Sequence, residues 1–286
     1  AGRIPLRAVL LVDLERQVPQ HGDDIGVIRD PDVDSSDAES VRTPVDGGLN
    51  VTVNVTPDIN GVPGAPITVL DNVFVAGARN YDYRVQFSGR TGGAFADHDL
   101  DNITSAQAAV APRPHTHADF SLGVSSGYKA TLLSAGLAPV VRSDTVDGDP
   151  HLRLIHDGNN NQKNAIAFDQ QQDSTLPGAT GIEADFDFRM TNAAGDPADG
   201  FSFMLIPTAQ YGTTGPGAAG ALAAAETPNA PGVFGIGIGV YGNRPHDRLS
   251  LNWNGAEVAN VVLDAFTQLN LDTGVFHRFS LELEES

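Results

Sequence analysis

The 286-residue sequence contains no cysteine, which excludes disulfide bonds and thiolate metal sites. Lysine is almost absent, with only Lys129 and Lys163, and the 17 basic residues face 36 acidic ones, for a formal net charge of −19. A chain with so little positive charge lacks the basic surface that nucleic-acid binding requires. No apolar run approaches the roughly 18 to 20 residues of a membrane-spanning helix. The sequence therefore predicts neither a nucleic-acid partner nor a membrane span.

What the sequence does contain is short alternating segments. Between Ile182 and Met190, apolar residues alternate with charged ones, which is typical of a strand with one buried face and one solvated face. Similar patterns occur at 51–56, 83–87, 152–156, 249–254 and 279–284. The 31 glycines and 18 prolines suit tight turns between strands, and no convincing amphipathic helix interrupts them. The sequence thus predicts an all-β fold with two antiparallel sheets packed as a β-sandwich.

A second apolar strand, 201–205, begins at a corner of sequence Ala198-Asp199-Gly200. The strand at 182–190, the polar turn after it and this corner resemble the core of the L-type (legume-type) lectins and their concanavalin A-like relatives. The resemblance implies a concanavalin A-like jelly roll in which the aspartate of the corner, here Asp199, holds a sugar hydroxyl. An Asp-Gly pair is also a common device for tight turns, so a purely structural role is the alternative.

The resemblance covers roughly residues 48–286, in a permuted order. Residues 48–106 resemble the closing strands of the family fold, residues 107–145 form a linker and an entry strand, and residues 146–286 resemble the main body. Either the chain closes on itself, or its closing strands complete a neighbouring subunit of a polymer. Closure within the chain is the simpler hypothesis, because the termini of such domains usually lie close together.

Residues 1–47 lie outside the resemblance and are predicted to form an N-terminal arm with an acidic linker. Apolar residues alternate from Ile4 to Leu14, which suits β-strand addition to another copy of the chain, although an extra edge strand or a helix is also compatible. Asp30, Asp32 and Asp34 alternate as in a Ca²⁺ loop, but the glycine and glutamate of an EF-hand loop are missing. A solvated acidic linker is the simpler interpretation, and Ca²⁺ is the one cofactor left open.

The resemblance also implies a set of glycan contacts. Residues 88–93 resemble a specificity loop of the family, in which Arg90 would donate to a sugar or pair with the acidic surface. Tyr241 and Asn243 match an aromatic residue and an asparagine beside the sugar and calcium of the family. The predicted carbohydrate site comprises Arg90, Thr91, Gly92, Asp199, Gly200, Tyr241 and Asn243.

One departure concerns the family's metals. Gly237 and Gly239 stand where the metal-bearing lectins carry an acid pair that helps to hold a transition metal and Ca²⁺. The two-metal site is therefore not expected here. Glycines that alternate along a strand indicate instead the close approach of another backbone.

Catalysis is a lesser alternative. Glu183, Asp185 and Asp187 share one strand face, as do the acids of some concanavalin-like glucanases, which carry glutamate at both ends. The far-end residue here is Asp187, and a solvated strand face explains the three acids more simply. We do not expect an enzyme.

The sequence thus predicts a non-catalytic carbohydrate-binding protein. An extracellular location is supported by three glycosylation sequons, at Asn50, Asn54 and Asn102. The main alternative is a self-assembling subunit of an extracellular filament or surface layer, joined by β-strand exchange.

Overall fold

The computed structural model describes residues 47–59, 61–94, 96–108, 113–121, 130–143, 149–158, 160–170, 181–191, 199–241, 247–266, 269–271 and 273–286. Residues 45–286 form one compact unit. The predicted arm, with its alternating segment and with Asp30, Asp32 and Asp34, lies outside the described residues. Among the residues described, no helix is both long enough and apolar enough to cross a membrane.

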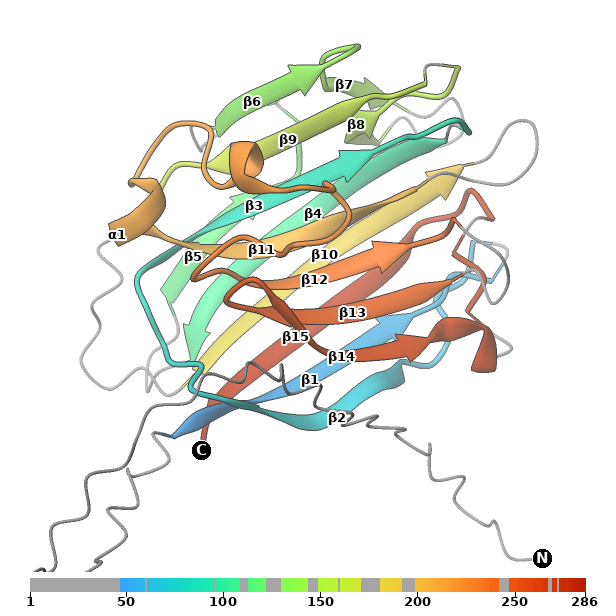
Figure 1. The fold of residues 1–286 in the computed structure, drawn as a ribbon. Coiled ribbons are helices and arrows are strands. Elements are labelled where there is room, and N and C mark those ends of the chain that lie inside the picture. Colours follow the sequence, from blue (N-terminus) through green and yellow to red (C-terminus); the bar gives the residue numbers. More distant parts are fainter. Residues whose placement is uncertain are drawn as a thin grey trace, which may run out of the picture. The chain divides into compact units, whose positions relative to one another are not determined.

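Two antiparallel sheets pack face to face, which confirms the predicted all-β sandwich (Figure 1). The front sheet of Figure 1 has the order β14 (Ala256–Val262), β13 (Arg248–Trp253), β12 (Phe234–Gly239), β11 (Gly200–Pro207), β3 (Tyr83–Arg90), β9 (Lys163–Phe168) and β6 (Ala130–Ala135). The back sheet has the order β2 (Ile67–Ala76), β1 (Gly48–Thr56), β15 (His277–Glu285), β10 (Gly181–Thr191), β4 (Asp97–Ala108), β8 (Pro150–Ile155) and β7 (Val140–Ser143), and β5 (Arg113–Ala118) pairs with β4. The helical elements are short: α1 (Thr208–Tyr211) and the 3₁₀ turns η1 (Ala219–Ala221) and η2 (Leu263–Ala265).

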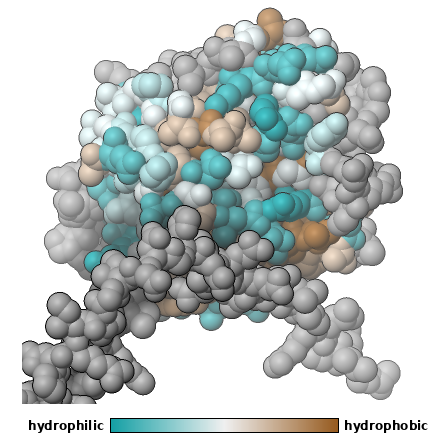
Figure 2. Space-filling view, in the orientation of Figure 1, coloured by the Kyte–Doolittle hydropathy of each residue, from teal (hydrophilic) through white to brown (hydrophobic). Residues whose placement is uncertain are grey.

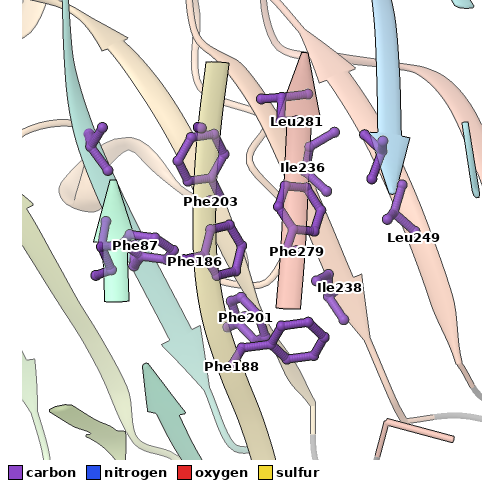
Figure 3. Close-up of a cluster of buried hydrophobic side chains, with 14 of the residues drawn as sticks. Phe87, Phe186, Phe188, Phe201, Phe203, Ile236, Ile238, Leu249, Phe279 and Leu281 are labelled. Atoms are coloured by element: carbon purple, nitrogen blue, oxygen red, sulfur yellow. The ribbon is translucent and has the colours of Figure 1, made fainter. Parts of the chain in front are cut away.

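The core between the sheets is rich in phenylalanine. Phe186 on β10 stacks on Phe279 of β15 with ring centroids 4.6 Å apart, and Phe87 of β3 meets Phe186 edge to face at 4.9 Å. Figure 3 shows these rings between the two sheets, together with Phe201 and Phe203 of β11. Aromatic pairs in such arrangements contribute about 0.5 to 1.5 kcal/mol each beyond their burial. The alternation seen in the sequence thus places one continuous apolar layer between the sheets.

The closing strands complete the sandwich of their own chain. β1 pairs with β15 from Leu49 opposite Glu285 to Thr56 opposite Arg278, so the first described strand lies beside the last one. The amide of Ser286 donates to the carbonyl of Gly48 at 3.1 Å. Further along the closing segment, β3 lies between β11 and β9, and β4 lies between β10 and β8.

A long connection between β11 and β12 lies across the outer face of the front sheet (Figure 1). It packs on a small apolar cluster that includes Met204, Ile206 and Leu222. A Cβ atom on Gly237 would lie 2.4 Å from the carbonyl oxygen of Glu226, and one on Gly235 would lie 2.5 Å from Cβ of Pro228. The predicted close approach of another backbone is thereby confirmed at Gly237, where that backbone belongs to the chain itself, whereas the nearest neighbour of Gly235 is a proline side chain and Gly239 has no such close neighbour.

Candidate functional site

The site begins where β3 ends and β11 starts. The amide of Asp199 donates to the carbonyl of Arg90 at 3.1 Å, and Gly200 is the cross-strand partner of Arg90. Gly200 has a φ of +141°, and a Cβ atom there would lie 2.0 Å from the carbonyl oxygen of Ile238. Only glycine fits this position. The Asp-Gly corner therefore has a backbone reason, and it places the side chain of Asp199 beside that of Arg90.

One arginine joins two carboxylates at this corner. Nε of Arg90 lies 3.0 Å from Oδ2 of Asp199, which makes an ion pair, although the N–H bond is not directed at an acceptor. The Nη2 atom of Arg90 donates to Oε1 of Glu226 at 2.6 Å. Glu226 lies in the connection that crosses the front sheet. The connection thus brings a second acid to the same guanidinium.

Both acids are largely removed from water. The side chain of Asp199 is 8% exposed and that of Glu226 is 14% exposed, whereas that of Arg90 is 38% exposed. Burial raises the pKa of Asp199, and the charge of Arg90 opposes this rise. Burial also raises the pKa of Glu226, a rise that the residue's own backbone amide and Arg90 oppose and that the charge of Asp199 reinforces. Two acids share one arginine, so the cluster carries an excess negative charge when both are ionised.

One carboxylate oxygen of this cluster lacks a hydrogen-bond donor. Oε2 of Glu226 is buried and has no hydrogen-bond partner among the residues that the structure describes. Buried polar atoms in native proteins are nearly always hydrogen-bonded, so an exception calls for an explanation, of which a functional role is one. The described residues leave this oxygen as an acceptor without a donor.

The predicted loop residues divide into two roles. A Cβ atom on Gly92 would lie 3.0 Å from Oδ2 and 3.2 Å from Oδ1 of Asp199, so this glycine leaves space beside the carboxylate. Thr91 is buried, and its Oγ1 accepts a hydrogen bond from the amide of Gln162 at 3.1 Å. The amide of Thr91 donates to the carbonyl of Gln162 at 3.0 Å. Thr91 therefore anchors the loop to its neighbour, and Gly92 faces the site.

Two glycines on adjacent strands leave backbone without side chains next to the two acids. Gly239 pairs with Gly200 on one side and with Arg248 on the other, and Phe201 and Leu249, one residue further along, are buried in the core. Because side chains alternate along strands, Gly239 and Arg248 face the outside of the front sheet. A Cβ atom on Gly239 would meet only the carbonyl oxygen of Asp199, at 3.8 Å. We call Gly200 and Gly239 together the glycine step, and its Gly239 half is not covered by the crossing connection.

Tyr241 follows the glycine step at the end of β12. Its side chain is 58% exposed, and the amide of the preceding Val240 donates to the carbonyl of Asp199 at 3.0 Å. The structure therefore brings Arg90, Gly92, Asp199 and Gly200 together in one rim, and Tyr241 lies two residues beyond Gly239. Asn243 lies outside the described residues, so its place in the site stays a prediction.

Two residues of this rim were missed by the sequence analysis. Glu226 ends an alanine-rich stretch and is separated from Arg90 by 136 positions, with no local motif to connect them. Arg248 begins β13 and forms an ion pair with Glu257 of β14. Its only signal in the sequence is its position one residue before an alternating strand.

The acids of the enzyme alternative lie elsewhere. Glu183, Asp185 and Asp187 project from β10, on the outer face of the back sheet. Asp187 accepts hydrogen bonds from Nε and Nη2 of Arg278 at 2.8 and 3.1 Å, and Asp185 accepts one from Ser280 at 2.6 Å. These contacts are made within the sheet and explain the two aspartates as strand-surface residues.

A metal centre is not formed by the part of the chain that the structure describes. In that part, no group of three or more histidine, cysteine, aspartate or glutamate side chains is placed to hold an ion. The Ca²⁺ loop predicted at Asp30, Asp32 and Asp34 stays a prediction.

Comparison with known proteins gave no match, whether against family models, curated proteins or solved structures. The resemblance to the L-type lectins therefore rests on the sequence motifs alone, and the evidence for a function comes from the residues of the rim.

Proposed function

We propose that this protein is a non-catalytic, lectin-like protein that binds glycans outside the cell. Its binding site is the rim made by Arg90, Gly92, Asp199, Glu226 and the glycine step. The observation that carries the proposal is the pair of carboxylates held by Arg90 beside uncovered backbone. Charged acceptors make hydrogen bonds to hydroxyl groups that are about twice as strong as those of neutral acceptors. Glycine leaves room for a sugar ring to approach the main chain.

Glycan-array binding tests the proposal, with Asp199→Asn as the matched variant. The substitution keeps the size of the side chain and removes the charged acceptor beside Gly92. We expect the wild-type protein to bind a defined set of glycans and Asp199→Asn to lose at least tenfold in affinity for them. Equal binding by both proteins would move the site away from this rim, and no binding by the wild-type protein would contradict the lectin-like function.

The second candidate is a self-assembling structural subunit, and exposed apolar residues at the sheet edges favour it. Among the described strands, β2 ends the back sheet and β14 ends the front sheet. Phe74 on β2 is 50% exposed, and Val258 and Val262 on β14 are 44% and 37% exposed. Figure 2 shows hydrophobic surface at the lower right, where β14 ends in Figure 1. Apolar edge strands are surfaces on which further strands can pair.

Light scattering and negative-stain imaging separate the two candidates. Ordered polymers that disappear in a Phe74→Lys, Val258→Lys double variant would support strand-mediated assembly, because charged residues on edge strands oppose pairing. A monomer or small oligomer that is unchanged by the double substitution would leave the lectin-like function as the better proposal.

A further inference from the structure

The rim also indicates which glycans it would accept, an inference that rests on the proposed function. The guanidinium of Arg90 is shared by Asp199 and Glu226. Because Nε of Arg90 contacts Asp199 and Nη2 contacts Glu226, the two carboxylates are held by neighbouring nitrogen atoms of one rigid planar group. Their separation is therefore set by the arginine before any ligand arrives, which is the preorganisation that a binding site needs.

The acceptors of this pair are not all used by the protein. Oε1 of Glu226 receives the hydrogen bond from Arg90, and Oε2 has no partner among the described residues although it is buried. Leaving a buried carboxylate oxygen without a donor is unfavourable. A ligand hydroxyl that donates to this oxygen would remove that cost, and it would do so beside the carboxylate of Asp199.

Among the described residues, nothing covers the Gly239 half of the floor next to the acids. The crossing connection covers Gly235 and Gly237, whereas a Cβ atom on Gly239 would meet nothing closer than 3.8 Å. On the far side of Gly239 stands Arg248, which is half exposed and paired with Glu257. A flat ring lying on the glycine step would thus have Glu226 at one edge and the Arg248–Glu257 pair at the other.

We infer that Glu226 is a second glycan acceptor beside Asp199, and that the rim takes neutral sugars with neighbouring hydroxyl groups and needs no divalent cation. The positive charge that holds the two acids together is Arg90, a residue of the chain. The excess negative charge of the cluster repels sialylated and uronate sugars, on a protein whose net charge is already −19. Oε2 of Glu226 lacks a donor among the described residues, and a neutral sugar hydroxyl group would supply one.

The test compares four proteins on the glycans that the wild-type protein binds: wild type, Glu226→Gln, Gly239→Leu and the control Glu282→Gln. The first variant replaces the charged acceptor with an amide of the same shape. The second places a side chain over the glycine step, where the backbone has room for a Cβ atom. The control removes one negative charge from β15, on the outer face of the back sheet.

We expect Glu226→Gln and Gly239→Leu each to weaken binding at least tenfold, and Glu282→Gln to bind within twofold of the wild type. Binding should be unchanged after dialysis against EDTA, and the bound glycans should be neutral. Circular dichroism and a thermal melt check that Gly239→Leu is folded. If it is not, Glu226→Gln carries the test alone, because its side chain keeps the same size.

Two failures are distinguishable. If the wild-type protein binds glycans but Glu226→Gln binds equally well, or EDTA abolishes binding, or sialylated glycans are preferred, this inference is wrong while the lectin-like function stands. If the wild-type protein binds no glycan at all, both are wrong.

Discussion

Asp99 and Asp199 are both buried and both held by arginine, and they are held in opposite ways. On the outer face of the back sheet, Oδ1 of Asp99 accepts from Nε of Arg153 at 2.8 Å. Its Oδ2 accepts from Nη2 of Arg153 at 3.1 Å and from Nε and Nη2 of Arg189 at 2.9 and 2.7 Å. At the front rim, Asp199 and Glu226 share the single guanidinium of Arg90.

The two clusters differ in the ratio of arginines to carboxylates. Around Asp99 two arginines meet one fully buried carboxylate, Nη1 of Arg153 also pairs with Asp97 at 2.7 Å, and Arg189 lies over the ring of Phe276 at 4.4 Å. Every oxygen of Asp99 is engaged. Around Arg90 two carboxylates meet one arginine, and Oε2 of Glu226 has no partner among the described residues. A charge cluster in which every carboxylate oxygen has a donor stabilises a fold. We call such a cluster saturated, whereas a cluster with an acceptor that lacks a donor can still bind a ligand.

The largest effect is expected from breaking the saturated cluster. Asp99→Ala leaves Arg153 and Arg189 without their shared carboxylate, and removing one partner from a buried ion pair costs about 3 to 5 kcal/mol. We expect urea denaturation to show a loss of this size. Glu183→Ala, at an exposed position of β10, serves as the control and should change the free energy of unfolding by about 0.5 kcal/mol or less. A loss below about 1 kcal/mol for Asp99→Ala would refute a stabilising role for the cluster.

Asp101 lies two residues from Asp99, and its Oδ1 has no hydrogen-bond partner within the described part of the chain. Burial raises the pKa of Asp101 to about 7, and the charges of Asp149, Asp187 and Asp119 reinforce the rise. Since the folded-state pKa lies above the unfolded one, the contribution to stability is complete below about pH 4 and is lost as the pH rises to about 7.

Asp101→Asn should therefore stabilise the protein by about 2 kcal/mol at pH 8 and have no such effect at pH 4. Thermal melts at the two pH values measure the difference. A variant whose stability follows that of the wild type at both pH values would show that Asp101 is charged without penalty in the folded protein.

Glu226→Gln is expected to separate stability from binding. Because burial raises the pKa of Glu226, the charged form is disfavoured in the folded state, and stability falls as the pH rises through that raised pKa. The substitution should raise the free energy of unfolding at pH 8 by about 0.5 to 1 kcal/mol while weakening glycan binding. Loss of both stability and binding would mean that the Arg90–Glu226 contact is structural.

The smallest effect is expected from pH alone. Asp199 and Glu226 both have a raised pKa, so they begin to take up protons at a higher pH than ordinary carboxyl groups do. A protonated acid is no longer a charged acceptor, and glycan affinity should decline gradually as the pH is lowered from 7 towards 4. Isothermal titration calorimetry across this range measures the decline, and constant affinity down to pH 4 would argue against carboxylate contacts.

Much of the fold was predictable because burial in a strand follows a local rule. The alternation from Ile182 to Met190 places every second residue in the core, and the structure buries those residues in β10. The alternating glycines of β12 likewise indicated a close backbone neighbour, which the structure shows at Gly237. The neighbour itself was not predictable, since only the fold shows that the connection just before β12 turns back over Gly237.

The candidate site was predictable only in part, for the same reason. Asp199 was found because an Asp-Gly corner before an apolar strand is a feature of adjacent residues. Glu226 was missed because its meeting with Arg90 requires the long connection to fold back over the front sheet. The hydrogen bonds that attach Thr91 to Gln162 were likewise not predictable, because the two residues lie 71 positions apart.

The alternation of the strands, the excess of acid over base and the absence of thiol chemistry follow from composition and from neighbouring residues, so they can be read from the sequence. How the excess acid is distributed depends on the folded chain. Two arginines meet at Asp99 and one is shared at Asp199, and this allocation depends on which distant strands and connections lie side by side. Electrostatic pairing acts through space over a few ångströms, so partners far apart along the chain are chosen by the fold.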